Sequence, residues 1–189
     1  MIASSDDGAA VTQERLHLGC GNDVLPGWVN HDLAALPGVD VVHDLDSYPW
    51  PFDDDRFREV RMHHVLEHLS EPVRAIEEIH RIARDGATVQ IRVPYWNSTD
   101  WASDPTHKTA FSEYSFDFFD PAKRHGRERP YYSSARFTVR SQTFWTKPVA
   151  VYLPVSNEIG RKVLSALARH FGGVIWVVEF ELVALKNTS

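Results

Sequence analysis

Residues 15–32 read Arg-Leu-His-Leu-Gly-Cys-Gly-Asn-Asp-Val-Leu-Pro-Gly-Trp-Val-Asn-His-Asp, and this stretch decides how the whole chain is interpreted. Leu16 and Leu18 alternate with polar residues, as in a short strand that ends abruptly at Gly19-Cys20-Gly21. A second apolar piece leads to the acid Asp32. Two glycines after a buried strand let a ligand approach the backbone, and an acid ending the next strand can accept hydrogen bonds from both hydroxyls of a ribose. The stretch predicts a nucleoside-binding edge, although a short Gly-x-Gly also suits an ordinary tight turn.

Two later segments extend this pattern. Asp40-Val-Val-His-Asp44-Leu45 reads as a third short strand ending in acids, and residues 57–62 read as a fourth strand that leads into His63-His-Val-Leu-Glu67-His68. Taken in order with Leu-Gly-Cys-Gly and Asp32, these pieces resemble the N-terminal half of a class I S-adenosylmethionine-dependent methyltransferase of the small-molecule type (methyltransferase type 11-like). The resemblance covers residues 15–95.

The resemblance implies that S-adenosyl-L-methionine is the cofactor and that the early strand ends bind it. A Cβ at Gly19 is then expected to collide with the ligand rather than with the protein itself. For the contact to the adenine amino group of the cofactor, Asp46 is an alternative candidate to Asp44. The residues that the resemblance assigns to the cofactor are Gly19, Cys20 and Gly21 near its amino-acid part, Asp32 and Leu33 at the ribose, Asp44 and Leu45 at the adenine, and His63 and His64 beside the sulfonium.

The predicted fold class is α/β, a Rossmann-like, doubly wound and mostly parallel sheet. Ser70 is a plausible N-cap for a helix whose first turn holds Glu71 and Pro72 and whose run ends at Gly86. Its apolar residues at helical spacing are Val73, Ile76, Ile79 and Ile82, and residues 87–93 alternate as the fifth strand. Strand, helix, strand in this order implies a parallel crossover. Between Gly21 and Asp32, Pro26-Gly27 leaves no room for a full crossover helix, so we expect a loop or a short helical turn there.

For the second half, the resemblance implies an antiparallel hairpin at the sheet edge, preceded by an insertion over residues 95–135 that covers the substrate. Within the insertion, a helix is predicted near residues 112–119, with Phe116 and Phe119 facing inward. Beyond it, the pattern predicts a strand over 136–145, a strand over 174–185, and between them a helix over 158–170 with Ile159, Val163, Leu164 and Leu167 on one face.

Methyl transfer needs little from the protein beyond aligning donor and acceptor and removing a proton. His64 and His107 are the candidate catalytic bases, because an imidazole has a pKa in the useful range. Tyr95, Trp96 and His107 are the candidate substrate-binding residues, since they follow the fifth strand. The predicted acceptor is an oxygen or nitrogen of a small metabolite.

Two alternatives remain open. His64-Val-Leu-Glu67-His68 also spells His-x-x-Glu-His, a zinc peptidase signature, so a zinc-dependent hydrolase is one of them, although no metal is assigned to the site. The other is a non-catalytic S-adenosylmethionine-binding protein, because the first crossover is short and His17 stands where many relatives carry an acid.

Composition sets the outer limits. The 189 residues suit one domain at 15–189 after a flexible tail at 1–14, with 43% hydrophobic and 24% charged residues as in globular proteins. A net charge of −6 argues against nucleic acid, and the cluster at 123–129 reads as a solvated loop. The single cysteine, Cys20, excludes an internal disulfide. No signal peptide or membrane span is evident, so a cytoplasmic protein is expected. The oligomeric state is left open, with a homodimer as one option.

Overall fold

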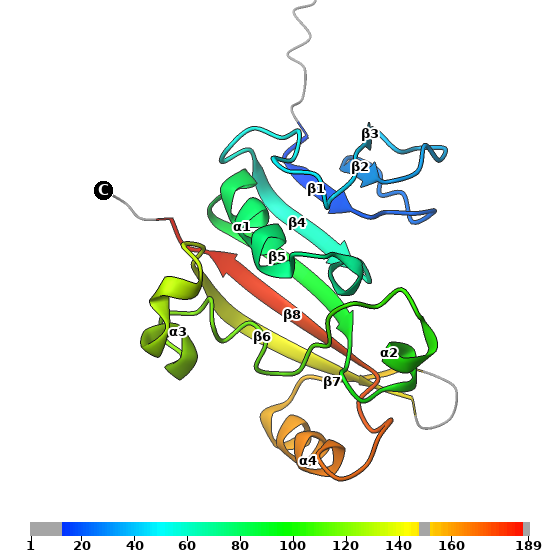
Figure 1. Cartoon of the computed structure of the whole chain (residues 1–189), viewed down its shortest axis with the longest axis vertical. Coiled ribbons are helices and arrows are strands. Elements are labelled where there is room, and N and C mark those ends of the chain that lie inside the picture. The colour runs from blue at the N-terminus through cyan, green and yellow to red at the C-terminus, as the bar shows by residue number, and fades with distance from the viewer. Residues whose placement is uncertain (1–12, 148–151, 187–189) are drawn as a thin grey trace, which may run out of the picture.

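The computed structural model describes residues 13–147 and 152–186, which fold around one eight-stranded sheet (Figure 1). Most of the predicted N-terminal tail lies outside the described residues. The strand order across the sheet is β3-β2-β1-β4-β5-β8-β6-β7. In chain order the strands are β1 (Arg15–Leu18), β2 (Val29–Asp32), β3 (Val41–Val42), β4 (Phe57–His63), β5 (Ala83–Pro94), β6 (Phe137–Thr146), β7 (Leu153–Val155) and β8 (Val177–Ala184).

The strands of the N-terminal half are parallel, and the C-terminal strands are antiparallel. β1 pairs in parallel with β2 and β4, β2 with β3, and β4 with β5. β8 runs antiparallel between β5 and β6, and β7 pairs antiparallel with β6 at the edge. This confirms the predicted mostly parallel α/β sheet with an antiparallel C-terminal pair. Because β1 to β5 are parallel, their carboxyl ends meet at one edge, where ligands bind in open α/β sheets.

The main helix, α1 (Pro72–Ile82), packs on one face of the sheet through Ala75, Ile76, Ile79 and Ile82 (Figure 1). Its N-cap is Glu71 and not Ser70, because the backbone N–H and hydroxyl of Ser70 donate to Asp46 instead. The remaining helical elements are the 3-10 helices η1 (Leu66–His68) and η2 (Pro130–Tyr132) and the α-helices α2 (Thr99–Ser103), α3 (Arg124–Glu128) and α4 (Glu158–Ala168).

The two faces of the sheet differ in polarity. On β5, Val89, Ile91 and Val93 are fully buried, whereas Gln90 and Arg92 on the opposite face are partly exposed. The described residues contain no helix between β1 and β4, and the loop after β1 lies near the polar face, where Asp23 pairs with Arg61. The loop predicted between Gly21 and Asp32 is therefore confirmed. Such alternation of buried apolar and partly exposed polar residues is expected in a sheet that helices cover on one face only.

The insertion between β5 and β6 divides into two parts. Its first part, with α2, lies at the carboxyl end of β5, and its second part runs back toward α3 at the opposite end of the sheet (Figure 1). The helix predicted near residues 112–119 is wrong: the segment is a succession of turns, in which the hydroxyl of Ser115 accepts from the backbone of Ser112. Serine side chains that bond to nearby backbone compete with helix formation. Phe116 and Phe119 are nevertheless buried, as expected.

The helix predicted over 158–170 is present as α4, but its predicted inward face is wrong. Ile159, Val163 and Leu167 are exposed, and only Leu164 packs against the core. The small residues Ser165 and Ala168 face the protein instead, where the Ser165 hydroxyl donates to Glu113 and the Asn97 amide donates to the Ala168 carbonyl.

Candidate active site

A cleft of about 270 Å³ lies at the carboxyl ends of β1, β2 and β4, where the sequence predicted a nucleoside site. Seven of the nine residues assigned to the cofactor line it. Cys20 and His63 do not. The lining residues are Gly19, Gly21, His31, Asp32, Leu33, His43, Asp44, Leu45, His64, Val65, His68 and Leu69.

The two glycines of the first turn have different roles. Both have positive φ, 65° at Gly19 and 52° at Gly21, a conformation that favours glycine. A Cβ at Gly19 would lie 2.2 Å from Cγ2 of Val65, so this glycine is required by the packing of the protein itself. A Cβ at Gly21 would meet nothing within 4 Å. The expected collision of a Gly19 side chain with the ligand is thus replaced by a collision with Val65, and Gly21 is the position that leaves open space.

Asp32 is oriented by the backbone on both sides of it. Its Oδ2 accepts from the N–H of Gly21 at 2.8 Å, and its Oδ1 accepts from the N–H of Ala34 at 3.0 Å. A carboxylate can accept about four hydrogen bonds, so two acceptor positions remain. The carboxylate is therefore fixed in direction and still able to accept two hydroxyl groups.

The loop that follows β3 places Asp44 and Asp46, the two candidates for the adenine contact, in different environments. Asp46 is engaged internally, because it accepts from Ser70 and from Lys108. Burial would raise the pKa of Asp46, but these hydrogen bonds outweigh it and lower the pKa. Asp44 is exposed at the cleft and Leu45 is buried beneath it, so the Asp44-Leu45 pair faces the cleft.

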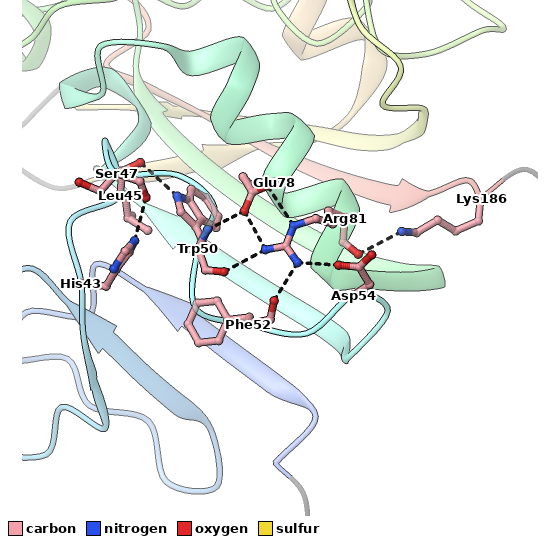
Figure 2. A network of polar contacts seen from close by, with 9 residues as sticks. All are labelled: His43, Leu45, Ser47, Trp50, Phe52, Asp54, Glu78, Arg81 and Lys186. Atoms are coloured by element: carbon pink, nitrogen blue, oxygen red, sulfur yellow. Dashed lines mark hydrogen bonds and ion pairs between the residues drawn. The ribbon is translucent and has the colours of Figure 1, made fainter.

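Arg81 of α1 anchors the same loop from behind (Figure 2). Its guanidinium donates to the carbonyls of Trp50 and Phe52 at 3.0 and 2.8 Å, and to Glu78 and Asp54. Figure 2 also shows the indole of Trp50 donating to the carbonyl of Leu45, at 3.1 Å. The position of Leu45 in the cleft is thus tied to the main helix through a chain of hydrogen bonds.

The adjacent histidines at the end of β4 lie in different environments. His64 has a positive φ of 55°, and its half-exposed ring lines the cleft. His63 belongs to the polar face, where Nδ1 accepts from Nε of Arg61 at 3.1 Å. Burial, with Arg92 and Arg61 nearby, lowers the pKa of His63 to about 3. His63 is therefore neutral and does not line the cleft.

A second pocket of about 210 Å³ adjoins the first and shares His64 with it. Its other lining residues are Arg92 of β5, Trp145 of β6, Tyr152 just before β7, and Val177 of β8. The Arg92 guanidinium lies 4.7 Å from the centre of the Trp145 ring and donates to Glu179. The pocket is therefore aromatic, with one cationic group that is already paired.

The residues predicted to bind substrate lie elsewhere. Tyr95 is 2% exposed, and its hydroxyl donates to Glu113 in the core, which together with burial raises its pKa. Trp96 is 45% exposed and lines neither pocket. The imidazole of His107 stacks on Trp101 at 5.2 Å, and its Nδ1 lies 3.0 Å from the Trp101 carbonyl.

The zinc peptidase signature does not adopt the helical geometry that it needs. His64 lies in the left-handed region before η1, which is only three residues long, so His64 and His68 are not one turn apart on a continuous helix. The fully buried Glu67 instead has His64 Nδ1 at 3.4 Å and His107 Nε2 at 3.9 Å from its Oε1. The acid thus lies between two histidines from separate parts of the chain.

Several residues that line the pockets were not identified from the sequence. In the first pocket these are His31, His43, Val65, His68 and Leu69, and in the second Arg92, Trp145, Tyr152 and Val177. His43 precedes Asp44 and was within the predicted third strand, so proximity to a landmark could have found it. No sequence signal marks the second set, because strand pairing alone brings these side chains together.

Comparisons with known proteins agree with this geometry. Residues 20–91 match the methyltransferase domain family. No curated protein sequence matches the chain. Among solved structures, a SAM-dependent methyltransferase from Archaeoglobus fulgidus is similar with a TM-score of 0.58 and 15% identity, over 89% of this chain and 85% of that one. A SAM-dependent methyltransferase, possible histamine N-methyltransferase, from Thermotoga maritima gives a TM-score of 0.56 and 12% identity, over 89% and 81%.

A third similar structure is the [4+2]-cyclase SpnF, with a TM-score of 0.53 and 14% identity, over 90% of this chain and 74% of that one. At such identities the likeness concerns the fold, and the cyclase shows that this fold is compatible with more than one reaction. The domain match over residues 20–91 and the shared fold make the chain similar to class I S-adenosylmethionine-dependent methyltransferases, whose cofactor is S-adenosyl-L-methionine.

Proposed function

We propose that this chain transfers the methyl group of S-adenosyl-L-methionine to an oxygen or nitrogen of a small metabolite, with donor and acceptor in the two adjoining pockets. The observation that carries the proposal is that His64 lines both. A residue at this border is the one that can reach the reacting atoms from the protein side.

The first pocket fits the cofactor in three respects. Gly21 leaves open space, Asp32 keeps two acceptor positions, and Asp44 with Leu45 offers an acid above an apolar surface. Asp32 would hold the ribose hydroxyls, and Asp44 would hold the adenine amino group. The cofactor, when bound, supplies a methyl group already activated on a sulfonium.

His64 is proposed to orient the acceptor and to accept its proton. Its positive φ ends the extended run of β4, and its backbone N–H donates to the carbonyl of Arg92, which fixes the backbone. Glu67 lies behind the ring, 3.4 Å from Nδ1, where its charge favours a proton on that nitrogen. We do not assign the same role to His107, because its Nε2 faces Glu67 and the residue lines neither pocket.

The second pocket is proposed to select the acceptor. Trp145 and Tyr152 present aromatic surfaces, which suit a planar or apolar molecule with few polar groups. The first part of the insertion borders the site through Lys108 and Thr109, whose N–H groups donate to the Glu67 carbonyl. We infer that this part of the insertion covers the substrate.

The test is methyl transfer from labelled S-adenosylmethionine to a panel of small hydroxyl- and amine-bearing acceptors. His64→Gln should lower turnover by about 100-fold or more, as loss of a proton acceptor does, while S-adenosylhomocysteine binds within roughly threefold of the wild-type affinity. His170→Gln, at an exposed position after α4, is the matched control. Tight S-adenosylhomocysteine binding without transfer to any acceptor would favour the non-catalytic cofactor-binding protein.

A further inference from the structure

The side chain of Glu67 is fully buried, and neither of its carboxylate oxygens has a hydrogen-bond partner among the described residues. A buried carboxylate without compensation is costly, because it loses hydration and gains nothing in return. The groups around it are imidazoles: one ligand atom each of Glu67, His68 and His107 lie within 4.8 Å of one another. A cation between these three groups would remove the cost.

Hydrogen bonds indicate which nitrogen of each imidazole carries the proton and which keeps its lone pair. His107 Nδ1 lies 3.0 Å from the Trp101 carbonyl, which can only accept, so Nδ1 carries the proton and Nε2 is the free nitrogen. The hydroxyl of Thr106 donates to Asp104 at 2.6 Å, so it accepts from His68 Nδ1 at 2.9 Å. The Nε2 lone pairs of both histidines are therefore free.

This arrangement is the one found around metal-binding histidines, whose second N–H typically donates to a carbonyl or a similar acceptor. Zinc bonds of about 2.1 Å in a tetrahedron place ligand atoms about 3.4 Å apart. The 3.9 Å between Glu67 Oε1 and His107 Nε2 needs only a small contraction. The Oδ2 of Asp104 lies 3.9 Å from the same Nε2 and is the nearest candidate for a fourth ligand.

We propose that Glu67, His68 and His107 form a binding site for a divalent transition-metal ion. Two imidazoles and a carboxylate suit zinc or cobalt better than magnesium or calcium, which prefer oxygen ligands. The ion joins η1, whose His68 lines the cofactor cleft, to the loop 104–109 at the start of the insertion. It therefore holds the insertion against the cofactor site. Oε1 of Glu67 faces both His64 and His107, and a carboxylate oxygen that binds an ion can still accept a hydrogen bond, so binding the ion and facing His64 are compatible.

The site differs from the zinc peptidase signature in its ligands. In the signature, His64 and His68 would hold the metal and Glu67 would be the general base. In the structure, His107, about 40 residues further along the chain, takes the place of His64, and Glu67 is itself a ligand. This replacement gives the test its discriminating variants.

The experiment titrates the metal-free full chain with Co²⁺ and with Zn²⁺, and measures the Co²⁺ absorption spectrum, the stoichiometry and the thermal midpoint. We expect one equivalent, a d–d spectrum of four- or five-coordinate cobalt, and a rise in the midpoint. His68→Gln and His107→Gln should each weaken binding by more than about 100-fold, and Thr106→Val, which removes a support of His68, by about 10- to 100-fold.

His170→Gln and His64→Gln should retain the site. Circular dichroism and S-adenosylhomocysteine binding establish that each variant is folded. The proposal is overturned if wild-type protein binds neither ion below about 100 μM, or if loss of His64 abolishes binding while loss of His107 does not. These readouts do not depend on methyl transfer, so they stand or fall separately from the proposed reaction.

Discussion

The first pocket, proposed to hold the cofactor and called the cofactor cleft, meets the second pocket, proposed to hold the acceptor and called the acceptor pocket, at His64. The two pockets are constructed differently. The cofactor cleft is lined by residues that all lie between Gly19 and Leu69, on loops that backbone hydrogen bonds hold at the ends of parallel strands. The acceptor pocket gathers Arg92, Trp145 and Tyr152 from distant parts of the chain. Under the proposed function, the cofactor contacts loops that lie close together in the chain, while the acceptor contacts side chains that the antiparallel strands bring together.

This difference predicts that the largest effects come from the backbone of the cofactor cleft. Gly19→Val should destabilise the fold by about 4 kcal/mol, because a positive φ and the 2.2 Å approach of Cβ to Val65 each carry a penalty. Urea unfolding measures this change. Gly21→Ala is the matched control, with a positive φ but no atom within 4 Å, and should lose only about 1 to 2 kcal/mol. A stable Gly19→Val protein that merely fails to bind cofactor would restore the original ligand-collision interpretation.

Acid should lower the free energy of unfolding through His31, which lines the cofactor cleft and is 1% exposed. Burial lowers the pKa of His31 to about 4, and its Nε2 donates to the carbonyl of His43. The unfolded chain takes up this proton near pH 6.5, so stability is complete above that pH and falls as the pH drops toward 4. The loss is on the order of 3 kcal/mol.

The free energy of unfolding, measured by urea titration from pH 7 to pH 4, tests this effect. His31→Gln should reduce the pH dependence across that window by about the contribution of this one group, since burial also lowers the pKa of His63, whereas His170→Gln, which removes an exposed imidazole, should leave it unchanged. An unaltered slope in His31→Gln would assign the acid sensitivity to other groups.

Cofactor affinity should depend on Asp32. Asp32→Ala is expected to weaken S-adenosylhomocysteine binding by about 2 kcal/mol through lost charge-assisted hydrogen bonds. Isothermal titration calorimetry measures it. Asp53→Ala, at an exposed position that lines neither pocket, serves as the control. Equal affinities in the two variants would remove Asp32 from the cofactor site.

The smallest effect should come from the acceptor pocket. Trp145→Leu is expected to raise KM for an acceptor about tenfold, near 1.4 kcal/mol, through lost aromatic contact, with no change in S-adenosylhomocysteine affinity. Steady-state kinetics with one active acceptor measures it. Trp28→Leu removes an indole that packs on Arg15, away from both pockets, and should leave KM unchanged. If Trp145→Leu weakened the binding of both the acceptor and S-adenosylhomocysteine, the two pockets would not be independent.

The described residues also include no helix long and apolar enough to cross a membrane. The exposed side of α4 carries the apolar residues Ile159, Val163 and Leu167. These residues are exposed because the helix approaches the protein through Ser165 and Ala168, whose small size allows close contact.

The sequence by itself determined how the parallel strands and the main helix follow one another along the chain. It also determined the positions of Gly19, Gly21, Asp32, Asp44 and Leu45 at the ends of the strands. These are local features: strand periodicity, glycine turns and acids at strand ends depend on near neighbours along the chain. The turns at 112–119 and the inward face of α4 were predicted wrongly because side-chain hydrogen bonds and contacts to remote elements outweighed helical periodicity.

Only the tertiary structure decided the functions of residues that depend on distant partners. It tied Asp46 to Ser70, placed Tyr95 in the core, and brought Arg92 and Trp145 to the border of the cofactor cleft. It also brought His107 to Glu67 and His68, two residues that the sequence motif groups with His64 alone. The physical reason is that periodicity fixes which side of a strand or helix a residue occupies, whereas the groups it meets there are supplied by segments far away in the chain.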